Sequence, residues 1–230
     1  MSYIAVLDFE NLDNGIFLHA FAKALARHKQ PGLVIHGDSE YTNRILQTGV
    51  MREQAARRAI KDLNLRLTAL FADAGVPAVA MHGFHRDAVM VSAERDKGTS
   101  WQDMITIRSE RLTHPPGTVL LLSCLAGVSE TDGASEALSS TRTTQILPLP
   151  ELARALMREL HIEQLILFSH AKGTDFIKLE LPETLSKSED RSFLEEHISR
   201  DFLASDLPFH LATPERFGME EHLYELPRVQ

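Results

Sequence analysis

The fold is decided by residues 33–92, which read LVIHGDSEYTNRILQTGVMREQAARRAIKDLNLRLTALFADAGVPAVAMHGFHRDAVMVS. The apolar run 33–36 breaks at a Gly-Asp-Ser turn, and this pattern predicts a strand. A helix is predicted at 52–74, because six apolar residues recur there at steps of three and four: Ala56, Ile60, Leu63, Leu67, Leu70 and Ala74. Gly75 and Pro77 end this helix, since glycine accepts a left-handed cap and proline cannot continue the hydrogen-bond ladder.

Two short apolar strands are predicted after the helix, at 78–81 and 88–91, and we expect them to be neighbours. A strand, a crossover helix and a second strand form a parallel pair. The sequence therefore predicts an α/β fold, with a mainly parallel sheet and helices on both faces in a three-layer αβα sandwich.

Further elements are predicted outside this stretch. Residues 118–126 are nearly all apolar, as in a central strand of a parallel sheet. Residues 129–144 are polar and predict a surface loop. A helix at 150–160, a strand at 209–212 as the last strand of the sheet, and a closing helix at 214–224 complete the expected fold.

The same sequence resembles the amino acid kinase family, and acetylglutamate kinase in particular. The matching pieces are LVIHGDS, TGVMRE and LNLRLTALFADAGVPAVAMHGFHRDAVMV. In the family, these places hold an apolar strand ending in His-Gly-Gly-Gly, a Gly-x-Arg-x-Thr turn and a long helix. The resemblance implies the amino acid kinase (carbamate kinase-like) sandwich, as one domain with a substrate-side half at 1–147 and a reduced nucleotide-side half at 148–230. It also implies a hairpin at 92–113 and a homodimer through the helix 52–74.

The resemblance also implies a ligand site for a small-molecule carboxylate. Its residues would be His36, Gly37, Asp38 and Ser39, in the place of the glycine-rich turn, and Arg52, displaced by one from the family's substrate-binding arginine. In the kinases the turn supplies backbone donors to phosphate or substrate oxygens. An alternative interpretation is that residues 38–39 cap a short helix at 43–46.

The cationic positions of the kinases are missing. Their first strand ends in Lys-x-Gly-Gly, where this chain has Leu7, Phe9 and Glu10, and their late Gly-Met-x-x-Lys matches Gly218-Met219 followed by two glutamates. A carboxylate beside a phosphate opposes phosphoryl transfer, so no catalytic residue is assigned. We favour a protein without kinase activity, with a small-molecule-binding, regulatory or assembly role and no cofactor. The alternative is an active ATP-dependent kinase of an amino-acid-type carboxylate such as N-acetylglutamate, using ATP and Mg²⁺.

Two groups of residues are candidate metal ligands. The sequence VLDFEN resembles metal-dependent nucleases of the NYN/PIN type, and Asp8, Glu10 and Asp38 would converge if their strands were adjacent. Otherwise Asp8 caps the following turn. His82 and His85 are too few for a metal site, so no metal is assigned from the sequence.

Composition narrows the possible partners. The net charge of −8 and the pI of about 5.8 disfavour nucleic acid and anionic membranes as partners. No apolar run approaches the roughly 18 residues of a membrane span. The single cysteine, Cys124, excludes an intrachain disulfide and is expected to be a buried thiol. Together these features predict a cytoplasmic protein that binds neither nucleic acid nor membranes.

Overall fold

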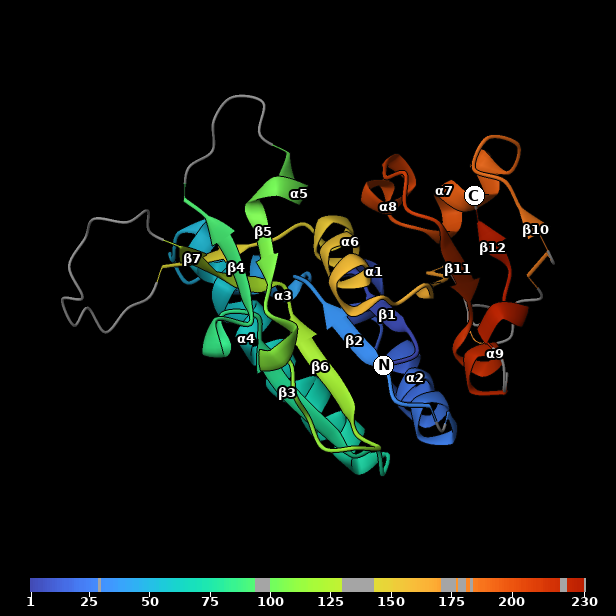
Figure 1. Cartoon of the computed structure of the whole chain (residues 1–230), viewed down its shortest axis with the longest axis horizontal. Coiled ribbons are helices and arrows are strands. Elements are labelled where there is room, and N and C mark those ends of the chain that lie inside the picture. Colours follow the sequence, from blue (N-terminus) through green and yellow to red (C-terminus); the bar gives the residue numbers. More distant parts are fainter. Residues whose placement is uncertain are drawn as a thin grey trace.

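The computed structural model describes residues 1–28, 30–93, 100–129, 143–170, 177, 181–182, 184–219 and 223–229. In these residues the chain forms one sheet of eight strands, in the order β10-β12-β11-β9-β1-β2-β6-β3, and one of four strands, in the order β5-β4-β7-β8. Figure 1 shows β4, β5 and β7 at one end of the molecule and β10, β11 and β12 at the other.

The central strands of the large sheet are parallel and buried on both faces. Their bounds are β1 (Ile4–Leu7), β2 (Leu33–His36), β6 (Val119–Ser123), β9 (Leu165–Phe168) and β11 (Phe209–Ala212). Strand β3 (Ala78–His82) is parallel to β6 at one edge of the sheet, and most of its residues are partly buried. The short strand β12 (Arg228–Val229) runs antiparallel to β11. Strand β10 (Thr184–Leu185) pairs with β12 and forms the edge of the sheet. Strands buried on both faces read as continuous apolar runs, which is why the sequence revealed them.

Alternate side chains of these strands pack into two separate cores, one on each face of the sheet. Ala5 and Leu7 of β1 belong to the core with α2 (Gly15–Arg27), α4 (Arg52–Asp73) and α9 (Pro214–Met219). Ile4 and Val6 belong to the core with the helices of the opposite layer, which are α6 (Leu149–Leu160), α7 (Arg191–His197) and α8 (Arg200–Ala204). The predicted three-layer αβα sandwich is therefore confirmed.

Helix α4 has the predicted length and the predicted buried side. Ala56, Ile60, Leu63 and Leu67 are buried, and Leu70 and Ala74 are partly buried. Phe71 is also fully buried, although it lies outside the predicted stripe. Gly75 has a φ of 77°, so the left-handed cap expected from glycine is present.

The predicted pairing of residues 88–91 with 78–81 is wrong. Residues 89–92 form β4 (Val89–Ser92) in the small sheet, which pairs with β5 (Ile105–Ile107) and β7 (Leu125–Ser129), and β8 (Thr144–Ile146) completes that sheet. Strand β3 pairs with β6 instead, and β6 separates it from β2. The chain leaves the large sheet at Gly83. The next residue, Phe84, donates its backbone N–H to the carbonyl of Leu125 in β7 at 2.8 Å. Strands of the small sheet have the same apolar pattern as strands of the large sheet, so the pattern could not show to which sheet residues 88–91 belong.

The prediction of a single strand over the apolar run 118–126 is also wrong. The run divides at Cys124 into β6 and β7, which lie in different sheets. Of the hairpin expected at 92–113, this range holds the second strand, β5, with α5 (Trp101–Met104) before it. Its antiparallel partner β4 lies earlier in the chain, at 89–92. The predicted polar loop at 129–144 lies largely outside the described residues.

The C-terminal end differs from the prediction in two ways. The strand at 209–212 is not the last of its sheet, because β12 pairs with it on the outer side. Helix α9 ends at Met219, and Leu223–Glu225 form a separate 3-10 turn. Two-residue strands such as β10 and β12 are too short to leave a period in the sequence.

Candidate functional site

The carboxyl ends of the parallel strands bring together residues that are far apart in the chain. Strands β1 and β9 are neighbours in the sheet. The strand that follows β1 in sequence, β2, lies on the side of β1 away from β9, and β11, which pairs with β9, lies on the side of β9 away from β1. The strand order thus reverses between β1 and β9, and ligands of open α/β sheets bind in the crevice at such a point. The residues that follow these two strands are Asp8 and, after Ser169, His170.

Asp8 is buried at this crevice, with 6% of its surface exposed. It caps α1 (Phe9–Leu12), and its Oδ1 accepts the Asn11 N–H at 3.3 Å, as the capping alternative predicts. Burial raises the pKa of Asp8 to about 6, and the nearby charge of Glu10 raises it further. The charge of His170 and hydrogen bonds from Asn11 and Ser199 lower the pKa, but by less. The end of β1, where the kinases carry Lys-x-Gly-Gly, therefore holds a buried carboxylate and no cation at residues 7–10.

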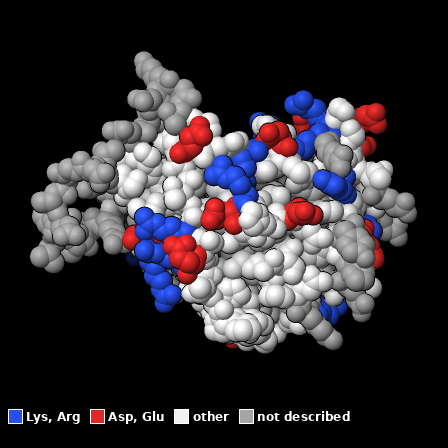
Figure 2. All heavy atoms as spheres, viewed as in Figure 1, with Lys and Arg blue, Asp and Glu red and all other residues white. Residues whose placement is uncertain are grey.

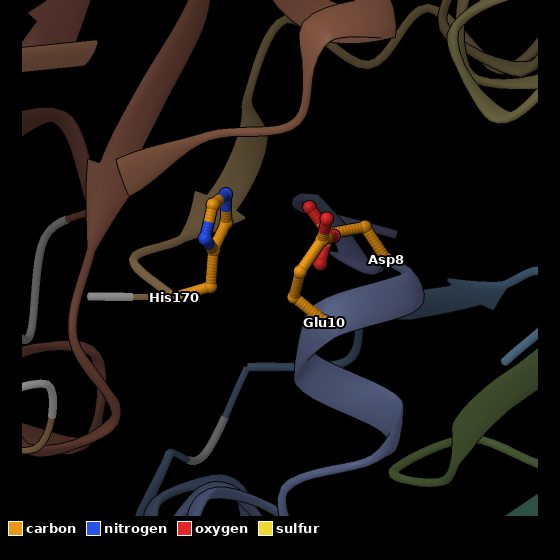
Figure 3. A group of neighbouring side chains, drawn as sticks. All are labelled: Asp8, Glu10 and His170. Atoms are coloured by element: carbon orange, nitrogen blue, oxygen red, sulfur yellow. The ribbon is translucent and has the colours of Figure 1, made fainter. Parts of the chain in front are cut away.

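Glu10 and His170 complete a cluster with Asp8, which Figure 3 shows with the imidazole facing the two carboxylates. One ligand atom from each residue lies within 4.8 Å of the other two. Glu10 is exposed on α1, and the His170 side chain follows β9. This is the one group of three or more potential metal ligands among the described residues.

A cavity of about 230 Å³ opens next to Asp8. Its apolar wall includes Phe9, Leu149 and Phe202, and its polar lining includes Ser199. Three of its described lining residues are aspartates, Asp8, Asp38 and Asp201, and none is a lysine or arginine. The cavity therefore suits a ligand with an apolar body and a positive or hydrogen-bond-donating end.

Two of the five sequence-predicted ligand residues, Gly37 and Asp38, line this cavity. Asp38 accepts hydrogen bonds from Ser39 N–H at 2.8 Å and from the Thr42 hydroxyl, and burial raises its pKa. Ser39 accepts the Tyr41 N–H at 3.1 Å, so residues 38–39 order the turn before α3 (Tyr41–Leu46). The N-cap of α3 is Glu40, and not residue 38 or 39 as the capping interpretation had it.

His36 and Arg52 do not line the cavity. His36 is fully buried, its Nδ1 lies 3.2 Å from the Gly37 carbonyl, and its Nε2 lies 3.0 Å from the Asn64 amide nitrogen. These contacts require a neutral ring that donates from Nδ1 and accepts at Nε2. Arg52 begins α4 with an exposed side chain, and its charge acts on Asp38 from outside the cavity.

The other candidate residues from the sequence have structural roles. Cys124 is buried, and burial raises the pKa of its thiol to about 12, so it remains protonated, as expected. His82 Nδ1 lies 2.8 Å from the Ser123 hydroxyl, and burial lowers its pKa to about 4. The ring of His85 lies 4.9 Å from that of His82.

Sequence reasoning missed His170, Ser199 and Asp201, all from the C-terminal half of the chain. The signal for His170 was its place just after the apolar strand 165–168, because strand ends in a parallel sheet converge. No local signal identified Ser199 and Asp201, which reach the cavity from the start of α8.

The surface shows no concentration of positive charge on the face in Figure 2. There the described lysines and arginines lie next to aspartates and glutamates. None of the described helices is both long and apolar enough to cross a lipid bilayer.

Comparisons with known proteins identify the fold. No protein-family model and no curated protein matches the sequence. Among solved structures, the chain is similar to N-acetylglutamate synthase from Neisseria gonorrhoeae complexed with coenzyme A and L-arginine. The TM-score is 0.61 at 16% identity, over 99% of this chain and 61% of the synthase.

Two kinases are similar as well. Aspartate kinase from Synechocystis matches with a TM-score of 0.62 at 12% identity, over 100% of this chain and 40% of that protein. Isopentenyl phosphate kinase from T. acidophilum, solved as a product complex, matches with a TM-score of 0.52 at 11% identity, over the whole of both chains. The chain thus spans less than two thirds of the synthase and of aspartate kinase. All three have the amino acid kinase fold, which confirms the predicted fold type, and fold alone does not establish activity.

Proposed function

We propose that this protein is a non-catalytic protein of the amino acid kinase fold, similar to acetylglutamate kinase on its substrate side, that binds a small amino-acid-type molecule in the cavity beside Asp8. The observation that carries the proposal is the buried carboxylate of Asp8 at the end of β1. Phosphoryl transfer requires positive charge where the phosphate's negative charge develops. Here the polyphosphate of ATP would meet Asp8 and Glu10.

The lining of the cavity indicates the chemistry of the ligand. Asp38 and Asp201 offer carboxylates to an ammonium or guanidinium group, and Phe9, Leu149 and Phe202 offer apolar contact to an aliphatic chain. An amino acid carries both features. The similar synthase was solved with L-arginine, which is a cationic amino acid of this kind.

Ligand binding is tested by thermal denaturation of the purified protein with millimolar arginine, glutamate, aspartate, N-acetylglutamate or Mg-ATP. We expect saturable stabilisation by a free amino acid, because a ligand that binds only the folded state raises the melting temperature. We expect none from Mg-ATP, since the carboxylates repel its phosphates. Asp38→Asn should reduce the ligand effect, whereas the control Asp73→Asn, exposed at the end of α4, should not.

The active kinase is the alternative function, and the same experiment separates the two. Saturable stabilisation by Mg-ATP, with phosphorylation of N-acetylglutamate or another carboxylate, would contradict the proposal. Stabilisation by N-acetylglutamate but by no free amino acid would also count against it, because an N-acetyl group removes the positive charge that Asp38 and Asp201 would bind.

We also propose that two copies pair through α4. Leu65 on α4 and Ile16 on α2 are 69% and 64% exposed, and a groove between these helices includes Leu18, Leu63 and Leu70. Large exposed apolar residues on these two helices, together with an apolar groove between the helices, favour a protein contact. Replacing both Leu65 and Ile16 with glutamate should convert a dimer into a monomer, measured by light scattering after gel filtration. The control Met219→Glu, an equally exposed apolar residue on α9, should remain dimeric, and a monomeric wild type would refute the pairing.

A further inference from the structure

We infer that Asp8, Glu10 and His170 form a binding site for a divalent transition-metal ion at the crevice between β1 and β9. The three side chains come from the ends of two adjacent parallel strands that are separated by about 160 residues of sequence. One potential ligand atom from each lies within 4.8 Å of the other two, and the side chains face one another in Figure 3.

Among the described residues, no lysine or arginine balances the two carboxylates of the cluster. Asp8 is buried, and the groups that hydrogen-bond to it are the Asn11 N–H and the Ser199 hydroxyl, both of them neutral. In the part of the chain that the structure describes, no lysine or arginine forms an ion pair with Asp8 or Glu10. Two neighbouring carboxylates, one of them buried, favour a bound cation because each repels the other.

A separate observation at His170 points to the same ligand. The Nε2 atom of His170 is buried and has no hydrogen-bond partner in the described structure. Buried polar atoms without a partner are rare in native proteins, and a metal ion bound to this nitrogen would supply the missing partner. The His170 backbone N–H donates to the His197 carbonyl at 3.1 Å, which holds the base of the side chain in place.

The ligand set indicates the type of ion. Mg²⁺ and Ca²⁺ prefer oxygen ligands alone, whereas one imidazole with two carboxylates suits Zn²⁺ or Mn²⁺. Three protein ligands leave a coordination position open on a tetrahedral ion. Ligand atoms about 2.0–2.1 Å from Zn²⁺ lie about 3.3 Å from one another, so the cluster has to contract by at most about 1.5 Å. Glu10 can supply this movement because its side chain is exposed.

The ion would also explain how an acidic cavity accepts a carboxylate. Asp8 belongs both to the cluster and to the cavity lining, so the ion lies at one end of the cavity. There it supplies the positive charge that the described lining lacks, and its open position accepts the ligand's carboxylate. This second step rests on the proposed function, whereas binding of the ion does not.

Metal binding is tested by calorimetric titration of the tag-free, chelator-treated protein with Zn²⁺ and with Mn²⁺, and with Mg²⁺ for comparison. We expect one site per chain for the transition ions, at least about 10-fold weaker binding of Mg²⁺, and a nitrogen ligand in the electron spin echo spectrum of the Mn²⁺ form. Glu10→Gln and His170→Gln should each weaken binding by at least about 10-fold.

Matched controls separate this site from binding by surface residues. His19→Gln on α2 and Glu163→Gln, at the opposite end of β9, replace exposed residues of the same types and should bind as the wild type does. Circular dichroism melts establish that each variant is folded. The inference fails if the wild type binds no ion below millimolar concentration, or if the cluster variants bind as tightly as the controls.

The ligand step has its own outcome. Amino-acid binding that strengthens at least about 10-fold with Zn²⁺ in the wild type, and not in His170→Gln, would support coordination of the ligand by the ion. One-site ion binding with no effect on amino-acid affinity would refute that step and leave the metal site standing. Amino-acid binding without any ion binding would refute the metal site and leave the proposed function standing.

Discussion

Acidification from pH 7 to pH 4 is expected to remove about 3 kcal/mol of stability through His36 alone. His36 is fully buried, and burial lowers its pKa from 6.5 to about 4. Between these values the unfolded chain binds a proton that the folded protein does not. The contribution of His36 is therefore fully present above pH 6.5 and is lost as the pH falls toward 4.

The bonds of His36 explain why it resists protonation. A proton on Nε2 would point at the Asn64 amide group, which already donates to that atom at 3.0 Å. The loss cannot be read from the wild type alone, because Asp8, with a pKa raised to about 6, changes stability in the opposite direction over the same range. Comparison with His36→Gln cancels the Asp8 contribution.

The measurement is urea unfolding of the wild type and His36→Gln at intervals from pH 7 to pH 4. Glutamine can keep one donor and one acceptor but does not titrate, so the difference between the two unfolding free energies should change by about 3 kcal/mol. Parallel pH profiles would show that His36 does not titrate in this way. Because His36 does not line the cavity, ligand affinity at pH 7 should be unchanged in the variant.

Gly83→Ala is expected to destabilise the protein by about 3 kcal/mol, at the upper end of typical overpacking effects. A Cβ at this position would lie 2.7 Å from the Leu125 carbonyl oxygen and 3.0 Å from the Val89 Cβ. Neither atom moves easily, since both belong to the small sheet. The φ of Gly83 is outside the left-handed region, so the expected cost comes from contact and not from backbone strain.

Gly15→Ala is the matched control for this substitution. Gly15 begins α2, and a Cβ added there meets no atom within 4 Å. Alanine favours helix over glycine by up to about 1 kcal/mol, so this variant should be as stable as the wild type or slightly more stable. Equal melting temperatures for Gly83→Ala and Gly15→Ala would refute the close approach of the two sheets at Gly83.

Much of the candidate site lies at the ends of neighbouring parallel strands, and the sequence alone does not show which strands are neighbours. Gly37 and Asp38 were identified from the resemblance, in the place of the kinases' glycine-rich turn after an apolar strand, and both line the cavity. His170 follows the strand 165–168 in the same manner, but its meeting with Asp8 depends on β9 lying beside β1. Apolar strands carry no mark of which neighbour they will pair with, because the backbone groups that join them are the same in every residue.

The sequence by itself determined the elements whose pattern is local: the buried run 33–36, the length and inner face of α4, and the cap at Gly75. Periodicity and turn chemistry act over a few residues, so they can be read before the chain is folded. Only the tertiary structure decided that β6 lies between β2 and β3, that β4 and β7 belong to a second sheet, and that Asp8, Glu10 and His170 meet. Those outcomes depend on which buried surfaces fit together across the whole chain, and that choice is made by packing and not by any local preference.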